Sequence, residues 1–260
     1  MPELNKELQR DISLPKVAVI IPCYNQGAYI QQAIESVITQ DYPAKAVFVS
    51  DEGSTDDSYE KIRSMFEETQ QHNEITVGKY KNTAIVLTKN PNPNGPSGAR
   101  NRLIQMAWES SDLFSMLDAD DYYLPGKISK SVKIMSADFE TISIVYTDAL
   151  IYNETGKYFI REYREPYSRQ RLEQECIISN TPLLNKKVFS KMTHLYDETM
   201  RTAEDWDFWL RLTKNNIAIH IPEAMHVYRV TGKNASDVVP KEVWNANWQK
   251  IRQRINGKRD

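Results

Sequence analysis

Three kinds of feature are scarce in this sequence, and each scarcity excludes a class of protein. Cys23 and Cys176 are its two cysteines, and a pair so far apart forms neither a disulfide framework nor a C-x-x-C metal site, which is typical of a reducing compartment. No apolar run approaches the ~20 residues that a membrane-spanning helix needs. Residues 1–16 are polar and carry both signs of charge, unlike a secretory signal or a transit peptide. We therefore expect a cytoplasmic protein.

An excess of basic charge is also missing. The formal net charge is -2 and the pI is about 6.2, so no global field attracts nucleic acid, and we expect no nucleic-acid partner. The length and apolar content suffice for one large domain or two small ones. We expect one domain at 16–236, preceded by an extension (1–15) and followed by an amphipathic helix (237–260).

Apolar runs alternate with helical patterns along the first half of the chain. We expect strands at 17–21, 46–49, 83–87 and 114–117, and helices at 28–38, at 56–69 and over the segment that carries Ala99 and Ala107. Residues 90–96 should form a loop, and 70–80 have no clear period. This alternation is typical of an α/β fold with a mostly parallel central sheet flanked by helices, in which ligands bind at the carboxyl ends of strands.

The second half is less regular. Expected elements are a helix from 125 to 136, strands at 142–152 and 158–163, a helix from about 202 to 212, strands at 217–221 and 226–230, and a helix at 240–255. Residues 152–182 contain several arginines and no motif that can be interpreted.

Three acids follow the apolar run at 114–117. Asp118 and Asp120 are two residues apart and would project from the same side of an extended backbone. Paired carboxylates at the mouth of a cleft suit Mg²⁺ or Mn²⁺ completed by phosphate oxygens. Acids are also common in turns, so for an isolated D-x-D an acidic loop that closes the strand is the more frequent explanation.

Five segments occur in a fixed order: IIPCYN (20–25), SDEGSTD (50–56), GPSGARN (95–101), LDADD (117–121) and EDWDFWLRL (204–212). Together they resemble the inverting family 2 glycosyltransferases, which have the Rossmann-like GT-A fold. The resemblance implies an enzyme that moves a sugar from a nucleotide-sugar, with a UDP-sugar favoured, to a hydroxyl of a glycan or lipid-linked acceptor in surface polysaccharide synthesis. It also implies a Mn²⁺ or Mg²⁺ cofactor, a nucleotide-sugar half at 16–122 and an acceptor half at 123–236.

The resemblance assigns donor contacts to the ends of the first two strands. Pro22, Tyr24 and Asn25 would flank the nucleotide, with the ring of Tyr24 as a stacking surface; packing on the next helix is the alternative for that ring. Asp51 or Glu52 would accept hydrogen bonds from the base or ribose, unless they form a solvated turn. The family commonly has two consecutive aspartates here, and Glu52 departs from that pattern, which leaves the preference for uracil open.

The segment 95–101 and the acid cluster, by which we mean Asp118, Asp120 and Asp121, would contact the phosphates. Backbone N–H groups near Ser97, with Arg100 and Asn101, could bind an anion; alternatively Ser97 caps the helix and Arg100 is a surface residue. By resemblance, Asp118 and the adjoining Ala119 contact the ribose or the metal. Asp120 would be the principal metal ligand, and Asp121 would support the cluster or cap a helix.

The catalytic carboxylate is assigned to Asp205, which would accept the proton of the acceptor hydroxyl, while Glu204 orients the acceptor or the base. Without the resemblance, both would be interpreted as acids that complement a helix dipole. Arg229 could close on the pyrophosphate as part of a lid. His226 is the imidazole available as a further metal ligand, although a histidine beside a strand is more often structural.

Three alternatives stay open. The chain could be another Mg²⁺-dependent nucleotide-processing enzyme or a non-catalytic nucleotide-sugar binding module. The last helix could pack its apolar stripe on the domain or serve as an interfacial anchor at an anionic membrane. Its apolar residues are Val243, Trp244, Trp248, Ile251 and Ile255, and its basic residues are Lys241, Lys250, Arg252, Arg254, Lys258 and Arg259.

Overall fold

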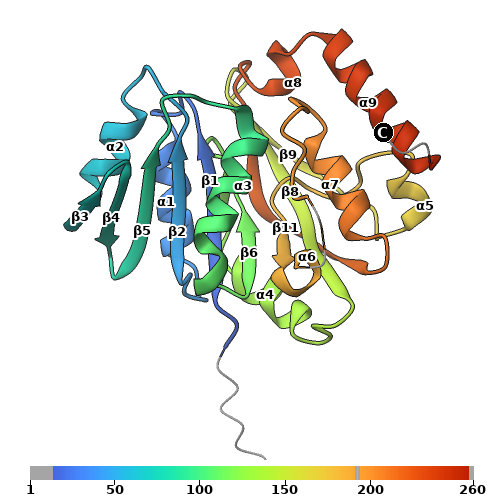
Figure 1. Ribbon diagram of the computed structural model, residues 1–260, viewed down its shortest axis with the longest axis horizontal. Coiled ribbons are helices and arrows are strands. Elements are labelled where there is room, and N and C mark those ends of the chain that lie inside the picture. Colours follow the sequence, from blue (N-terminus) through green and yellow to red (C-terminus); the bar gives the residue numbers. More distant parts are fainter. Residues whose placement is uncertain (1–13, 191, 193, 258–260) are drawn as a thin grey trace, which may run out of the picture.

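The computed structural model describes residues 14–190, 192 and 194–257, and its described residues form an 11-stranded sheet between two layers of helices (Figure 1). The strands are β1 (Val17–Cys23), β2 (Ala46–Asp51), β3 (Glu68–His72), β4 (Ile75–Tyr80), β5 (Thr83–Lys89), β6 (Leu113–Met116), β7 (Tyr122–Tyr123), β8 (Ile142–Asn153), β9 (Tyr158–Glu162), β10 (Leu183–Asn185) and β11 (Ile217–Val230). The helices are α1 (Ile30–Ile38), α2 (Ser58–Ser64), α3 (Gly95–Ala107), the 3-10 turn η1 (Trp108–Ser110), α4 (Lys127–Met135), α5 (Arg169–Leu172), α6 (Lys186–Phe189), α7 (Glu204–Leu212), α8 (Ala235–Val238) and α9 (Lys241–Ile255).

The strand order is β3-β4-β5-β2-β1-β6-β10-β8-β11-β7, with β9 paired to β8. Strands β5, β2, β1 and β6 pair in parallel, as do β8 and β11. The parallel core of the first half is therefore confirmed, whereas β10 lies antiparallel between β6 and β8, and the sheet as a whole is mixed. Because the four core strands are parallel, their carboxyl ends meet at one edge, where the polar loops lie.

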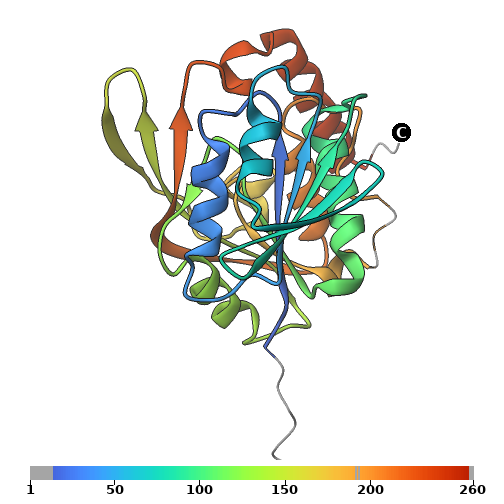
Figure 2. The ribbon, with the colours of Figure 1, turned by 90° about the vertical axis from the view of Figure 1, so that its left-hand side faces the viewer.

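The two faces of the sheet are covered by different helices (Figure 2). Ala18 and Ile20 of β1 pack in the core under α3 and α7, whereas Val17, Val19 and Ile21 pack in the core under α1 and α4. This is the burial expected of a strand covered on both faces, and it explains the unbroken apolar run of β1.

Three elements differ from the sequence expectation. Helix α2 ends at Ser64 rather than near residue 69, and the segment without a clear period forms the β3–β4 hairpin. Gly78 permits this hairpin, because a Cβ there would lie 2.5 Å from the ring of Phe66. The two strands expected at 217–221 and 226–230 are one strand, β11, whose register shifts at bulges between Ile221 and Val227.

The C-terminal helix packs on the domain. Ile251 of α9 is fully buried and Trp244 is partly buried against the main core, but Trp248 is 42% exposed. Packing is thus the observed arrangement for the apolar stripe, except at Trp248. Lys258 and Arg259, like residues 1–13 of the expected extension, lie outside the described residues. Within the described ranges, no helix has the length and apolar composition that crossing a membrane requires.

Candidate active site

The loops after β1 and β2 are tied to each other. Asn25, at φ 53°, accepts a hydrogen bond from the backbone N of Thr55 (2.8 Å), and its own N donates to Ser54 Oγ (2.9 Å). Asn25 therefore builds the loop rather than facing outward. Pro22 lies within β1, which runs on to Cys23. The side chain of Tyr24 is 56% exposed beside this loop, so its ring is accessible to a ligand.

The two acids at the end of β2 are used differently. Glu52 is buried and accepts hydrogen bonds from Arg102, Ser50 and Asn90 (Asn90 at 2.9 Å). Asp51 is also buried, yet no hydrogen bond from a described residue reaches either carboxylate oxygen. Burial raises the pKa of the Asp51 carboxyl group, and the nearby hydroxyl and backbone N–H of Ser54, which lie outside hydrogen-bond geometry, offset this in part. An unsatisfied buried carboxylate is costly, so Asp51 is the acid of this pair that is free to bind a ligand.

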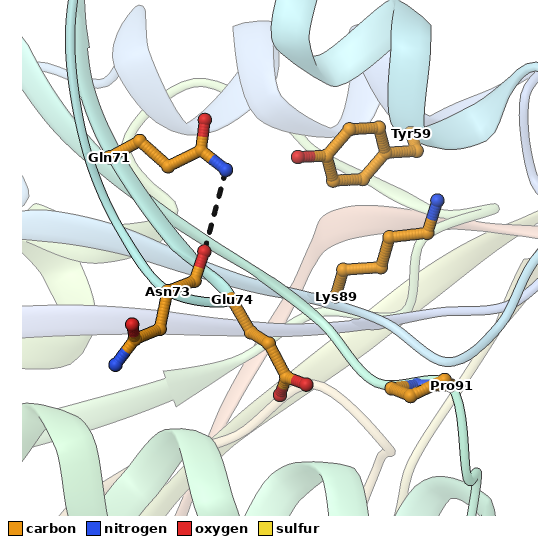
Figure 3. Close-up of a pocket in the computed structure, with 6 residues that line it drawn as sticks. All are labelled: Tyr59, Gln71, Asn73, Glu74, Lys89 and Pro91. Atoms are coloured by element: carbon orange, nitrogen blue, oxygen red, sulfur yellow. Dashed lines mark hydrogen bonds between the residues drawn. The ribbon is translucent and has the colours of Figure 1, made fainter.

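A pocket of about 220 Å³ lies beside the end of β5 (Figure 3). It is lined by Tyr59, Gln71, Asn73, Glu74, Lys89 and Pro91. Lys89 is the register partner of Asp51, and its Nζ lies 4.7 Å from the centre of the Tyr59 ring. This pocket is on the β3–β4 side of Asp51, and none of its lining residues belongs to the acid cluster.

Arg100 joins the two halves of the site. It is buried on α3, where Nη2 donates to Asp118 Oδ1 and Nη1 donates to Glu204 Oε1, each at 2.7 Å. Its guanidinium lies 5.4 Å from the centre of the Tyr196 ring. Removing one partner of a buried ion pair is costly, because the other charge stays buried. Arg100 thus fixes the start of α7 beside the end of β6.

The acid cluster is held by residues that the sequence analysis did not identify. Asn180 Nδ2 donates to Asp118 Oδ2 (2.9 Å) and to Asp121 Oδ2 (3.1 Å), and Asn234 Nδ2 lies 3.4 Å from Asp120 Oδ2. The chain brings these asparagines in from positions 59 to 114 residues away. No local pattern marks them, so sequence reasoning had no signal for either.

The donor set of Asp118 and Asp120 fits a hard divalent cation. Burial, and then repulsion from Asp118, raise the pKa of Asp120 to about 6, which marks an excess of negative charge that a cation would relieve. Asp121 is fully buried and accepts from the backbone N of Arg229 (2.9 Å), so it supports the cluster as expected. Ala119, between the two candidate ligands, is buried. Across the described ranges, no three His, Cys, Asp or Glu side chains are grouped as a metal site.

Asp205 is the second residue of α7, and its neighbour Glu204 is held by Arg100. Its Oδ1 accepts from the backbone N of Trp206 (2.7 Å). Burial, and then the charge of Glu204, raise the pKa of Asp205 to about 6. Asp205 therefore has a raised pKa and follows Glu204 directly. Glu204 and Asp118 are both bound by Arg100.

In the segment 95–101, the side chains of Ser97 and Asn101 contact the loop before α7. Helix α3 begins at Gly95, so Ser97 lies inside the helix rather than capping it, and its Oγ donates to the backbone O of Met200 (3.3 Å). Asn101 Nδ2 donates to the backbone O of Tyr196 and to Glu198, each at 2.9 Å. Both side chains hold the loop before α7, because the first two turns of α3 pack against that loop.

Two expectations for the last strand also change. Arg229 is buried in β11, where its guanidinium lies between the rings of Tyr29 (5.1 Å) and Tyr122 (4.7 Å) and donates to Gln32 and to the backbone O of Asp120. It is a fixed support of the acid cluster rather than a lid residue that is free to reach phosphate.

His226 is buried with Nδ1 3.5 Å from Thr147 Oγ1. Burial, and then the nearby charge of Lys127, lower its pKa well below the ordinary value. These contacts are those of a structural histidine, and the structure brings Asn234, not His226, to Asp120.

Relatives of known sequence match most of this chain at low identity. The chondroitin synthase of Pasteurella multocida (strain Pm70) is 25% identical over 224 residues, which cover 86% of this chain and 21% of that protein. An uncharacterised glycosyltransferase of Rickettsia felis is 29% identical over 221 residues, which cover 84% of this chain and 33% of that protein. The chain thus spans between a fifth and a third of the length of these relatives.

Solved structures show the same fold. The structure of S. aureus TarS 1–349 in complex with UDP-GlcNAc superposes with a TM-score of 0.67 at 17% identity, over 92% of this chain and 71% of that one. Residues 18–192 match the sequence model of glycosyl transferase family 2, and this covers more than half of the chain. The chain therefore belongs to glycosyl transferase family 2 and has the GT-A fold, as its motifs indicated.

Proposed function

We propose that this chain transfers a sugar from a UDP-sugar to a hydroxyl group of a glycan acceptor, with inversion at the anomeric carbon. The observation that carries the proposal is the Arg100 bridge, whose two ion pairs of 2.7 Å join Asp118 on the donor side to Glu204 beside the candidate base. Single displacement requires the base and the leaving diphosphate on opposite sides of one sugar carbon. A rigid link between their two supports suits that requirement.

The nucleotide would bind across the ends of β1 and β2. The unpartnered Asp51 carboxylate would accept hydrogen bonds from the base, and the exposed ring of Tyr24 would stack on it. Asp51 carries this role without Glu52, whose oxygens are already engaged. The crystal structures of TarS in complex with UDP and with UDP-GlcNAc support uracil as the base.

Asp118 and Asp120 would hold a Mn²⁺ or Mg²⁺ ion against the diphosphate. Bound there, the cation would stabilise the negative charge that develops on the leaving nucleoside diphosphate. Arg100 and Asn180 orient the Asp118 carboxylate for this task, and Asn234 does the same for Asp120.

Asp205 would accept the proton of the attacking acceptor hydroxyl. The oxygen then bonds to the anomeric carbon while the bond to the diphosphate breaks, and the proton ends on the Asp205 carboxylate. A carboxyl group with its pKa raised to about 6 is a better base for this step than an ordinary aspartate and is still largely ionised at neutral pH.

The acceptor would be a glycan. The names of the relatives, chondroitin synthase and hyaluronan synthase, support polysaccharide synthesis. The outer strand β9 adds a physical argument, because Tyr158, Phe159 and the nearby Tyr163 are exposed, and aromatic rings suit contact with the apolar faces of sugars.

The proposal is tested by incubating the protein with a panel of sugar nucleotides, Mn²⁺ and glycan acceptors while nucleoside diphosphate release is followed. We expect release from one UDP-sugar that depends on acceptor, and an NMR spectrum of the product that shows an inverted anomeric centre. Retained configuration would contradict the mechanism. Binding of a UDP-sugar without any release would favour the alternative of a non-catalytic binding module.

A further inference from the structure

The turn before α7 is held by the C-terminal helix. Asn247 of α9 is buried, and its Nδ2 donates to the backbone O of Thr202 (3.0 Å) and to Thr202 Oγ1 (2.9 Å). Thr202 is itself buried and is separated from Asp205 by Ala203 and Glu204. A side chain far along the sequence thus fixes the backbone immediately before the proposed base.

The same turn has an unfavourable backbone conformation. Ala203, the residue that precedes α7, has φ 55° and ψ 19°, a left-handed conformation that residues with a Cβ adopt at a cost in free energy. Such a conformation persists when surrounding contacts determine it. Here Asn247 holds Thr202 on one side of Ala203, and Arg100 holds Glu204 on the other.

Helix α9 also contacts α7 itself, at Asp207, two residues after the proposed base. Arg254 Nη1 donates to Asp207 Oδ1 (2.7 Å), and its Nη2 donates to Asp197 Oδ2 (2.6 Å). Arg211 donates to the other oxygen of Asp207 (2.9 Å). The first turn of α7 is therefore fixed by α9 both before and after Asp205.

We propose that Asn247 is a positioning residue for the transfer reaction. Through Thr202 it keeps Ala203 in the left-handed conformation that directs the Asp205 carboxylate toward the acceptor hydroxyl. This inference rests on the proposed role of Asp205. It gives Asn247, on a helix outside the segment 18–192 that matches the family, a part in positioning the base.

The test compares two variants of the full chain on the same helix. Asn247→Leu has a similar volume and lacks the donors, and displacement of a reacting group by about 1 Å lowers turnover by up to about 100-fold. We expect kcat to fall by about 10- to 100-fold with the donor KM within about twofold, because no hydrogen bond or ion pair of the described residues joins Asp51, Tyr24 or the acid cluster to α9. The control is Lys250→Met, which removes the contacts of Lys250 with Asp197 (2.8 Å) and Thr199 (2.7 Å) and should leave kcat within about twofold.

Thermal melting of both variants verifies that they are folded at the assay temperature. Equal kcat in the two folded variants, or a loss that appears in donor KM instead, overturns the proposal. Should Asn247→Leu fail to fold, Thr202→Val decides, since it removes Oγ1 alone: a reduced kcat supports the proposal and an unchanged kcat overturns it. Asp205→Asn is measured in parallel. If it keeps full turnover, the proposed function fails. If Asp205→Asn loses turnover while folded Asn247→Leu keeps kcat within about twofold of the unsubstituted chain, this inference alone fails.

Discussion

At the scale of single residues, substitutions of Asp205 and Asp120 should differ in their effects on turnover and on donor binding, and the two quantities can be measured separately. Asp205→Asn preserves size and the contact with the backbone N of Trp206 but removes the proton acceptor. We expect kcat to fall by about 100- to 10,000-fold, the usual yield of general acid–base catalysis, with UDP-sugar affinity nearly unchanged. Calorimetry and initial rates on the same preparation measure both, and turnover near that of the unsubstituted chain would exclude Asp205 as the base.

Asp120→Asn, unlike Asp205→Asn, should weaken donor binding. Its carboxylate lies beside that of Asp118, and burial, followed by repulsion from Asp118, raises the pKa of Asp120 to about 6. Removing one negative charge weakens cation binding, so we expect Mn²⁺-dependent UDP-sugar affinity to fall at least about tenfold, or about 1.4 kcal/mol, together with transfer. Asp205→Asn is the matched control that retains donor binding. We expect the Asp120→Asn variant to bind the donor equally well with and without Mn²⁺. If Mn²⁺ raises its donor affinity as much as in the unsubstituted chain, the assignment of Asp120 as a metal ligand is wrong.

The pH dependence of kcat follows from the raised pKa of Asp205, about 6. The carboxyl group accepts a proton only when ionised, so turnover should rise tenfold per pH unit well below pH 6 and level off above it. In Asp205→Asn this limb should be absent from the residual rate. A profile that is flat between pH 5 and pH 7 in the unsubstituted chain would show that another group limits the reaction.

The residues that the sequence assigned to the site belong to local motifs. Asp51, Asp118, Asp120 and Asp205 follow strands or lie at the start of a helix, and Arg100 joins Asp118 to Glu204, the neighbour of Asp205. The partners Asn180, Asn234 and Asn247 could not be predicted. Each acts through one amide at a position set by long-range packing, and an isolated asparagine in an irregular segment carries no periodic or motif signal.

At the scale of elements, long periodic segments were predicted well and short amphipathic ones were not. The apolar runs of β1, β2 and β5 and the periodic pattern of α9 lie where the sequence placed them. The polar strand β3 is fully exposed, so it lacks the alternation that identifies a strand, and its pairing with β4 decides its conformation. The expected break within β11 reflects bulges, which no local pattern distinguishes from a loop.

Helix α9 should act as a packed helix rather than a membrane anchor. Ile251 is fully buried, and Lys250 and Arg254 are engaged with Asp197, so two of its basic side chains are not free for lipid. We expect Ile251→Ala to lower the free energy of unfolding by about 2–5 kcal/mol, measured with urea. Trp248→Ala, at an exposed position of the same helix, is the control and should change it by about 0.5 kcal/mol or less. Sedimentation with liposomes that increases with anionic lipid would instead support the anchor.

At the scale of the whole molecule, one edge of the sheet collects groups from distant parts of the chain. Asp51 ends β2, Asp118 follows β6, and Asp205 is the second residue of α7, while Arg100 from α3 joins Asp118 to Glu204, the first residue of α7. The parallel core explains why the first two meet at that edge. The antiparallel insertion of β10 and the return of β11 beside β8 place the second half against them.

A ligand that spans this edge should stabilise the entire domain. Anything that binds the folded state alone raises stability by RT ln(1 + [L]/Kd), about 2.7 kcal/mol at a concentration of 100 Kd. With about 2–4 °C per kcal/mol for a domain of 150–250 residues, Tm should rise by roughly 5–10 °C. In a thermal-shift screen with Mn²⁺, we expect UDP-sugars to exceed GDP-sugars, because Asp51 is the buried acceptor left for the base. Asp51→Asn should reduce that difference while Asp205→Asn keeps it; equal shifts for all nucleotides in the unsubstituted chain would mean that Asp51 does not select the base.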